Sequence, residues 1–358
     1  MNLIEALADG VGPRTAGSSA ASEASELVAR AFRELGLEPR FQEFELLAYD
    51  ADEPELVVEG ERWAAGPCMY AHPFDGAGTV RRIGQQRSPV GDTMLPVFAV
   101  VDAGGREAAR LLTSPFSTGA IPFMSAHVHI TTPPTAFVSA HDSGRLEDGM
   151  RVRLKVGGRF LPGRIERNVI ADIPGRDTDH VVVGAHYDSV WRGPGAVDNA
   201  SGVEGVRRIG EALAGRRLER GVRLVAFAAE EIKLTGSRYY VDEARLRGAF
   251  DRTAAMVNLD CIAHGEKLNI LASPGATLER ATDIAAELGL LDRYELVTGP
   301  ATGGVDSHWF AEHGIPAVTV LHFPYDEYHL PEDTAALVDE RLLGDAVELG
   351  LALVEAQL

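Results

Sequence analysis

The chain has 358 residues, of which 45% are hydrophobic and 24% are charged, an ordinary balance for a globular protein. This length exceeds that of one small domain and suits one large domain with an insertion. The formal net charge of −19 argues against a nucleic-acid partner, which would require a basic face, and against docking on an anionic membrane.

Cysteine usage and the N-terminal sequence predict a soluble, cytoplasmic protein. The two cysteines, Cys68 and Cys261, lie far apart, which favours reduced, buried thiols over a disulfide framework. The first residues include Glu and Asp and lack the basic region and apolar run of a signal peptide. No uninterrupted apolar stretch reaches the length of a membrane span.

The first part of the chain predicts a helix, a strand and then a change of character. Residues 18–36 repeat apolar residues on one helical face, and Gly36 ends the pattern. Residues 39–49 alternate like a strand. From about residue 48 the chain has short alternating runs with many Gly and Pro. We predict strands at VFAVVDA, AFVSA and RVRLKVGGRF, a short helix at REAARLLTS, and a solvated strand face at His127 and His129.

This change of character predicts two domains. Residues 48–163 form a mostly β inserted domain, and residues 1–47 and 164–358 together form a larger domain. From Asn168 onward, buried β-branched runs alternate with helical patterns. That alternation predicts an α/β fold, a three-layer sandwich with a mainly parallel central sheet and helices on both faces. Functional sites in such sheets lie at the carboxyl ends of the strands.

Polar residues end three of the predicted buried strands. HVVVGAHYD ends in His186 and Asp188, GVRLVAFAAEE ends in Glu230 and Glu231, and AAMVNLD ends in Asp260. Parallel strands bring such ends to one edge of a sheet. Crowded carboxylates repel one another and resist ionisation unless a cation lies between them. Imidazole and carboxylate ligands suit zinc or a similar first-row metal.

Two loops contain further candidate ligands. Asp198 lies in GPGAVDNASG, directly before a predicted helix, and His329 lies in YHLPEDT. Helix capping would explain one of Asp198, Asn199 and Ser201, but not the whole cluster. His322, seven residues before His329, is the alternative imidazole.

Five sequence blocks resemble a known enzyme family. The blocks, in chain order, are GAHYDS, GPGAVDNASG, AAEEIKLTGS, NLD and YHLPEDT. Together they resemble the bacterial leucyl aminopeptidase and glutamate carboxypeptidase type of co-catalytic di-zinc peptidases. The resemblance covers residues 168–334 and, loosely, the N-terminal helix. Residues 48–163 resemble the protease-associated domain that is often inserted in this family.

The resemblance implies two zinc ions per chain. Asp198 would bridge them, with His186 and Asp260 completing one site and Glu231 and His329 completing the other. The YHLPEDT context favours His329 over the alternative imidazole.

The resemblance also implies two catalytic residues. Glu230 would take a proton from a metal-bridging water and deliver it to the leaving amine. Asp188 would orient the His186 ring, as metal-bound imidazoles usually require. The residues by themselves do not distinguish the metal ligand from the base within the Glu230–Glu231 pair.

We therefore expect hydrolysis of a peptide or an amino-acid amide, most simply removal of an N-terminal residue, for which Asp326 or Glu327 would bind the substrate ammonium. A carboxypeptidase or dipeptidase would instead need a basic group such as Arg192. Acyl transfer of the glutaminyl-cyclase kind, with one zinc, is a further alternative. A non-catalytic binding protein on this scaffold would have broken ligand positions, whereas here each is filled.

One block departs from the family pattern. VDSHWF places Asp306 before Ser307, where a serine-aspartate-histidine order is expected. We expect this loop to line the substrate pocket.

Overall fold

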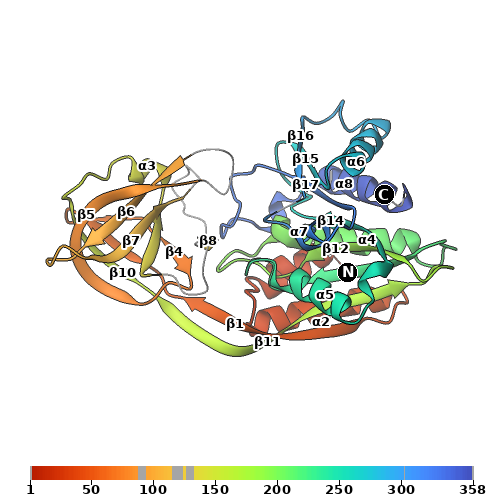
Figure 1. Cartoon of the computed structure of the whole chain (residues 1–358), viewed down its shortest axis with the longest axis horizontal. Coiled ribbons are helices and arrows are strands. Elements are labelled where there is room, and N and C mark those ends of the chain that lie inside the picture. The colour runs from red at the N-terminus through yellow and green to blue at the C-terminus, as the bar shows by residue number, and fades with distance from the viewer. Residues whose placement is uncertain (1, 88–93, 115–123, 126–132, 302, 357–358) are drawn as a thin grey trace. The chain divides into compact units, whose positions relative to one another are not determined.

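The computed structural model describes residues 2–87, 94–114, 124–125, 133–301 and 303–356 (Figure 1). The chain divides into two compact units, a larger one of residues 1–46 and 164–358 and a smaller one of residues 47–163. His127 and His129 lie outside the described residues.

The larger unit is built on one sheet, to which the described residues contribute eight strands. In spatial order they are β1 (Arg40–Ala51), β11 (Gly158–Ile173), β13 (Gly221–Phe227), β12 (His180–His186), β14 (Thr253–Leu259), β17 (Ala317–His322), β15 (Leu268–Ala272) and β16 (Leu296–Pro300). The four central strands, β13, β12, β14 and β17, are mutually parallel. β11 pairs antiparallel with β13, and β15 pairs antiparallel with β17. The predicted mainly parallel sheet is therefore confirmed at its centre.

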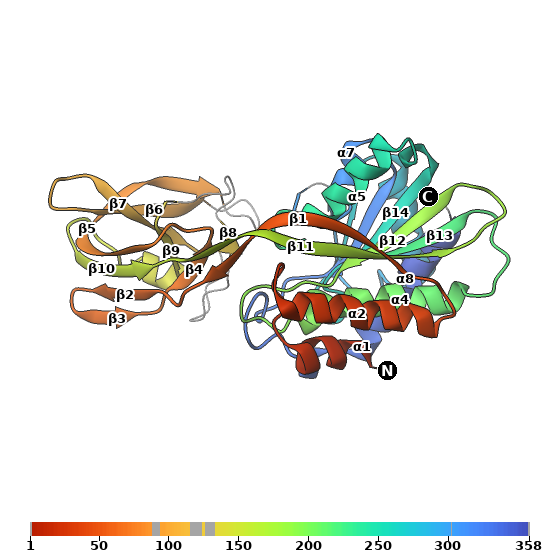
Figure 2. The same cartoon turned by 90° about the horizontal axis from the view of Figure 1, so that it is seen from below.

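Helices cover both faces of this sheet (Figure 2), as the sandwich prediction requires. One face carries α1 (Leu3–Glu5), α2 (Ser19–Glu34), α4 (Gly202–Leu213), α6 (Ala276–Glu287) and α8 (Glu340–Ala356); the other carries α5 (Thr235–Leu246) and α7 (His308–Glu312). Between these layers every residue of β12 is buried, because a strand covered on both faces has no solvated side. None of the helices among the described residues has the length and apolar composition needed to cross a membrane.

The smaller unit contains a second sheet with its own hydrophobic core. Its described strands are β2 (Glu55–Val58), β3 (Glu61–Trp63), β4 (Gly66–Met69), β5 (Phe74–Arg87), β6 (Met94–Val101), β7 (Glu107–Thr113), β8 (Met124–Ser125), β9 (Thr135–Val138) and β10 (Arg151–Val156), with the short helix α3 (Ala140–Ser143). The core is aliphatic and aromatic and includes Leu56, Phe98, Leu111 and Leu154.

The helix predicted at residues 106–114 is wrong. This segment is strand β7, which pairs antiparallel with β6 and parallel with β9. Alanine and leucine favour helices locally. Pairing with two strands outweighs that preference, because it buries Ala109 and Leu111 in the core.

A buried histidine makes the stability of the larger unit depend on pH. His322 on β17 is fully buried against the ring of Tyr294, and neither ring nitrogen has a hydrogen-bond partner among the described residues. Burial lowers the pKa of His322 from 6.5 to about 4. The unfolded chain therefore takes up a proton that the folded protein resists, so stability is lost as the pH falls from 6.5 to 4.

Replacing His322 with Leu should remove this dependence. Between pH 7 and pH 4, the metal-free wild type should lose on the order of 3 kcal/mol more unfolding free energy than the variant. Urea unfolding at both pH values measures the difference. Equal losses in the two proteins would contradict the assignment to His322.

Candidate metal centre

The predicted ligands gather at one edge of the central sheet. β12 ends at His186, whose register partner on β13 is Phe227. The chain after β13 leads to Glu230 and Glu231, and Asp260 directly follows the last residue of β14. Because these strands are parallel, their carboxyl ends lie at the same edge.

Asp198 lies between two imidazoles. Its Oδ1 is 3.1 Å from His186 Nε2, and its Oδ2 is 3.1 Å from His329 Nε2. Asp260 Oδ1 is 3.6 Å from the same nitrogen of His186, and Glu231 Oε2 is 3.4 Å from that of His329. The five residues thus form two half-sites that share Asp198.

The two glutamates take different positions. Glu231 groups with Asp198 and His329, with candidate ligand atoms all within 4.8 Å of one another. Glu230 groups in the same way with His186 and Asp260. The geometry therefore gives the two carboxylates different neighbours, a distinction that the sequence alone did not offer.

Charge and burial show that a cation suits this cluster. Burial, with a smaller contribution from neighbouring carboxylates, raises the pKa of Glu230 well above its ordinary value and that of Glu231 to about 8. Burial also disfavours the charged form of Asp198, but hydrogen bonds from His186 and His329 outweigh it and lower that pKa. Glu231 Oε1 is buried without a hydrogen-bond partner among the described residues. Two imidazole nitrogens among crowded carboxylate oxygens are a donor set that zinc accepts.

Asp188 fixes the backbone on which both glutamates lie. Its Oδ1 accepts a hydrogen bond from the Glu230 amide at 3.0 Å, and its Oδ2 accepts one from the Glu231 amide at 3.3 Å. The His186 ring was expected to be oriented by this carboxylate, but its Nδ1 lies 3.1 Å from the Asp188 carbonyl oxygen and 3.6 Å from Oδ1. Asp188 thereby links the segments after β12 and β13.

Asp198 lies in a turn, Ala196–Ser201, and the backbone conformation just before this turn requires glycine at position 195. Gly195 has φ +57°, and a Cβ there would lie 2.1 Å from the Asp198 carbonyl oxygen. The peptide bond between Asp198 and Asn199 is cis. Asp333 accepts hydrogen bonds from the amides of Val197 and Asp198 at 2.8 and 3.0 Å.

Asn199 and Ser201 connect this turn to the end of β14. Asn199 Nδ2 donates to the Leu259 carbonyl at 3.0 Å, and its Oδ1 accepts from the Cys261 amide at 3.2 Å. Ser201 Oγ accepts from the Ile262 amide at 3.1 Å. Ser201 shows no capping hydrogen bond. Both side chains instead hold Asp198 beside the segment that contains Asp260.

His329 is positioned by its own backbone and by its neighbour. It adopts φ +61°, and the Tyr328 ring stacks on its imidazole with centroids 3.8 Å apart. His322 lies within β17 against Tyr294, and no contact between it and a predicted ligand side chain is seen among the described residues. The geometry therefore favours His329 as the second imidazole of the cluster.

Sequence reasoning missed three residues of this region. Cys261 Sγ lies 3.4 Å from Asp260 Oδ1 and forms a third candidate group with Asp198 and Asp260. Asp333 supports the turn, as described above. Arg14 is fully buried and donates to the carbonyls of Tyr187, Pro194 and Gly195. Nothing in the sequence around Arg14 indicated contacts with residues so distant in the chain.

The residues predicted to select the substrate lie close to the ligands in the chain. Arg192 is exposed, with its guanidinium 4.2 Å from the centroid of the Trp191 ring. Asp326 and Glu327 line a hollow of about 560 Å³, and Glu327 Oε2 is 3.8 Å from His264 Nε2.

The loop that departs from the family pattern contains a buried carboxylate. Asp306 is fully buried, and the negative charges of Asp260 and Asp188 help to raise its pKa to about 7, burial being the main cause. The side chain of Asp306 is thus withdrawn from solvent.

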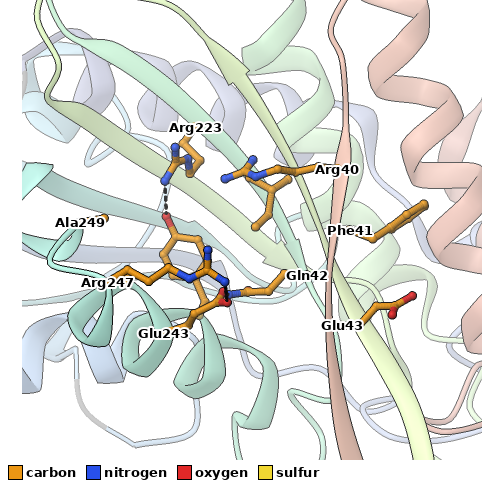
Figure 3. A pocket seen from close by; sticks show the side chains of 11 residues that line it. Arg40, Phe41, Gln42, Glu43, Arg223, Glu243, Arg247 and Ala249 are labelled. Carbon is orange, nitrogen blue, oxygen red and sulfur yellow. Dashed lines mark hydrogen bonds and ion pairs between the residues drawn. The ribbon is translucent and has the colours of Figure 1, made fainter.

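A further hollow of about 740 Å³ contains three arginines. Figure 3 shows Arg40 and Arg223 directed toward one another across it, with Arg247 beside Glu243. Arg40 and Arg223 both pair with Asp172, and Arg247 pairs with Glu243. Arg223 lies near the start of β13, whereas the predicted ligands follow the strand ends. Since each arginine has a carboxylate partner, we assign this hollow no ligand.

Two imidazoles and two further carboxylates around a shared aspartate, with Glu230 beside them, form a donor set typical of metal-dependent hydrolases. The sequence signature of Peptidase family M28 matches residues 168–354. The chain belongs to this family, as the resemblance predicted.

Two aminopeptidases are similar to this chain in sequence. Aminopeptidase YwaD of Bacillus subtilis is 25% identical over 394 aligned residues, covering 99% of this chain and 83% of YwaD. Leucine aminopeptidase 2 of Trichophyton equinum is 40% identical over 115 residues, which are 30% of this chain and 23% of that protein.

Solved structures share the fold. The zinc aminopeptidase BSAP from Bacillus subtilis gives a TM-score of 0.77 at 21% identity, covering 99% of this chain and 93% of BSAP. A glutaminyl cyclase from an Acidobacteriales bacterium gives a TM-score of 0.58 at 16% identity, with 99% and 92% covered.

Proposed function

We propose that this peptidase is a zinc-dependent aminopeptidase with two zinc ions per chain. One observation carries the proposal: the two oxygens of Asp198 face two different imidazoles at equal distances of 3.1 Å, each with a further carboxylate beside it. A shared carboxylate between two such half-sites suits a pair of metals better than one metal.

His186 and Asp260 would hold one zinc ion, Glu231 and His329 the other, and Asp198 both. When bound, the two ions supply Lewis-acid polarisation of the scissile carbonyl and lower the pKa of a nearby water. The burial and mutual repulsion of the carboxylates in the cluster support this donor set.

Glu230 is the general base in this proposal. Its carboxylate lies in the cluster, while its backbone amide is held by Asp188 at 3.0 Å, so the side chain starts from a fixed position. Glu230 takes a proton from the attacking water and returns it to the leaving amine as the peptide bond breaks. The hydrogen bond to Asp188 positions this base.

An aminopeptidase is favoured over its alternatives. YwaD and BSAP, both described as aminopeptidases, align over 99% of this chain. Asp326 and Glu327, close in the chain to His329, supply carboxylates for a substrate ammonium. The glutaminyl cyclase has the lower TM-score, and the shared Asp198 favours two metals over one.

The proposal also includes a cytoplasmic location and a role for the smaller unit. Both cysteines are buried thiols outside any disulfide, which suits a reducing cytoplasm. Residues 48–163, a compact β unit with its own core, would be a protease-associated domain.

Three substrates and one metal measurement test the function. Purified protein should contain two zinc ions per chain, release leucine from Leu-Gly-Gly and from leucyl anilide, and leave acetyl-Leu-Gly-Gly intact. EDTA should abolish the release, and added zinc should restore it. Cleavage of the acetylated peptide alone would indicate a carboxypeptidase. Metal-loaded protein that cleaves none of these substrates would contradict the proposal.

A further inference from the structure

We infer that Arg14 is a positioning residue of the metal centre, a buried cation that fixes the two chain segments on either side of the bridging aspartate. The inference rests on the proposed function, because it concerns the affinity of that site for metal. Arg14 lies more than 150 residues before the first predicted ligand, outside the M28 match at residues 168–354.

The guanidinium of Arg14 joins two ligand-bearing segments. Its Nε donates to the Tyr187 carbonyl at 2.5 Å, directly after His186. Its two terminal nitrogens donate to the carbonyls of Pro194 and Gly195, the latter at 2.7 Å. Gly195 begins the turn that contains Asp198. The planar fork of one arginine thus reaches both segments at once, which the single ammonium of lysine cannot match.

The backbone of Arg14 makes the same connection. Its amide donates to Ser189 Oγ at 3.0 Å, and Ser189 Oγ donates in turn to the Gly193 carbonyl at 2.8 Å. Three residues along the chain, the Gly17 amide donates to Glu166, whose other oxygen accepts from the Tyr187 hydroxyl at 2.9 Å. The N-terminal segment is therefore hydrogen-bonded, directly or through Glu166, to the residues that follow β12.

The charge of Arg14 matters because of what surrounds it. Its side chain is 0% exposed, and burial lowers its pKa to about 10, while the carboxylates of Asp188, Asp333, Asp198 and Glu231 all favour its charged form. Burying a guanidinium is tolerated only when its donors and its charge are both compensated. Reciprocally, Arg14 offsets part of the repulsion among these carboxylates.

Asp333 completes the support of the bridging turn. Arg14 binds carbonyl groups at the start of the turn, and Asp333 binds the amides of Val197 and Asp198 in its middle. Asp198 is therefore held from both sides by residues that face its backbone and leave its two carboxylate oxygens toward the imidazoles. Loss of Arg14 would free one side of this turn and weaken metal binding.

Zinc competition with a chromophoric chelator tests the inference in four full-length proteins: wild type, Arg14→Met, Arg14→Lys and the control Arg223→Met. We expect Arg14→Met to weaken zinc binding by about 10- to 100-fold, the range for residues that orient metal ligands. Arg14→Lys should recover part of the loss. Arg223→Met, which removes a partly buried arginine that pairs with Asp172, should bind zinc within about threefold of wild type even if its melting temperature falls.

Cobalt(II) spectra give a second measurement that general destabilisation would not alter. Folded Arg14→Lys should show shifted visible bands, whereas folded Arg223→Met should reproduce those of wild type. If Arg14→Met does not fold, Arg14→Lys decides. Wild-type zinc affinity and unshifted bands in Arg14→Lys, or an equal loss of affinity in Arg223→Met, would overturn the inference. Zinc content and leucine release by the wild type test the proposed function separately.

Discussion

Replacing Glu230 with Gln should lower kcat for leucyl anilide by about 10²- to 10⁴-fold, because a general base contributes this much to a hydrolytic step. Glutamine has nearly the same volume but cannot accept the proton. Zinc content should stay at two ions per chain, since the other carboxylates and both imidazoles remain. Steady-state kinetics and metal analysis of the same preparation measure both quantities.

Two variants control for this experiment. Glu231→Gln removes the carboxylate that lies 3.4 Å from His329 Nε2, so it should lose zinc as well as activity. Glu243→Gln, on α5 beside Arg247, should leave both unchanged. If Glu230→Gln kept most of the wild-type rate while holding two zinc ions, another group would have to serve as the base.

Replacing Asp198 with Ala should have the larger effect on metal. This carboxylate contacts both imidazoles of the cluster, so its loss should disrupt both half-sites. We expect fewer than one zinc ion per chain after dialysis and a zinc affinity reduced by more than about 100-fold, beyond the range for residues that only orient ligands. Elemental analysis and chelator competition measure these values.

Asp260→Ala is the matched comparison. It removes a carboxylate that lies beside His186, so the half-site of Asp198, Glu231 and His329 keeps its full donor set. This variant should therefore retain about one zinc ion per chain. Equal retention of two ions by Asp198→Ala would show that the aspartate is not shared.

The sequence predicted those parts of the site that follow from strand order. Polar residues after three buried runs predicted that His186, Glu231 and Asp260 would meet, and the sheet is parallel where these strands lie. A metal centre at that edge then follows from repulsion among the carboxylates. The directions of the strands toward the edges of the sheet could not be predicted. Antiparallel strands such as β11 consist of the same apolar residues as parallel ones.

The sequence pattern could not predict contacts between segments that are distant in the chain. Arg14 and Asp333 bind backbone groups, which every residue presents, so no complementary residue type marks their partners. The strand β7 escaped prediction for a related reason. Its alanines and leucines favour a helix by themselves, and only the strands on either side make an extended chain preferable.

The Arg14 contacts also decide which fragment of this chain can be an independent enzyme. Every predicted ligand and the base lie between His186 and His329, so residues 168–358 look sufficient on the basis of chemistry. Such a fragment would lack Arg14 and Gly17, and with them the hydrogen bonds to the segments around Tyr187 and Gly195. It would also leave a buried cavity where the guanidinium lies, bordered by unpaired carbonyl groups. The smallest active fragment therefore has to be assembled from two stretches of sequence, with the N-terminal stretch joined to the rest across residues 47–163 or across a linker that replaces them.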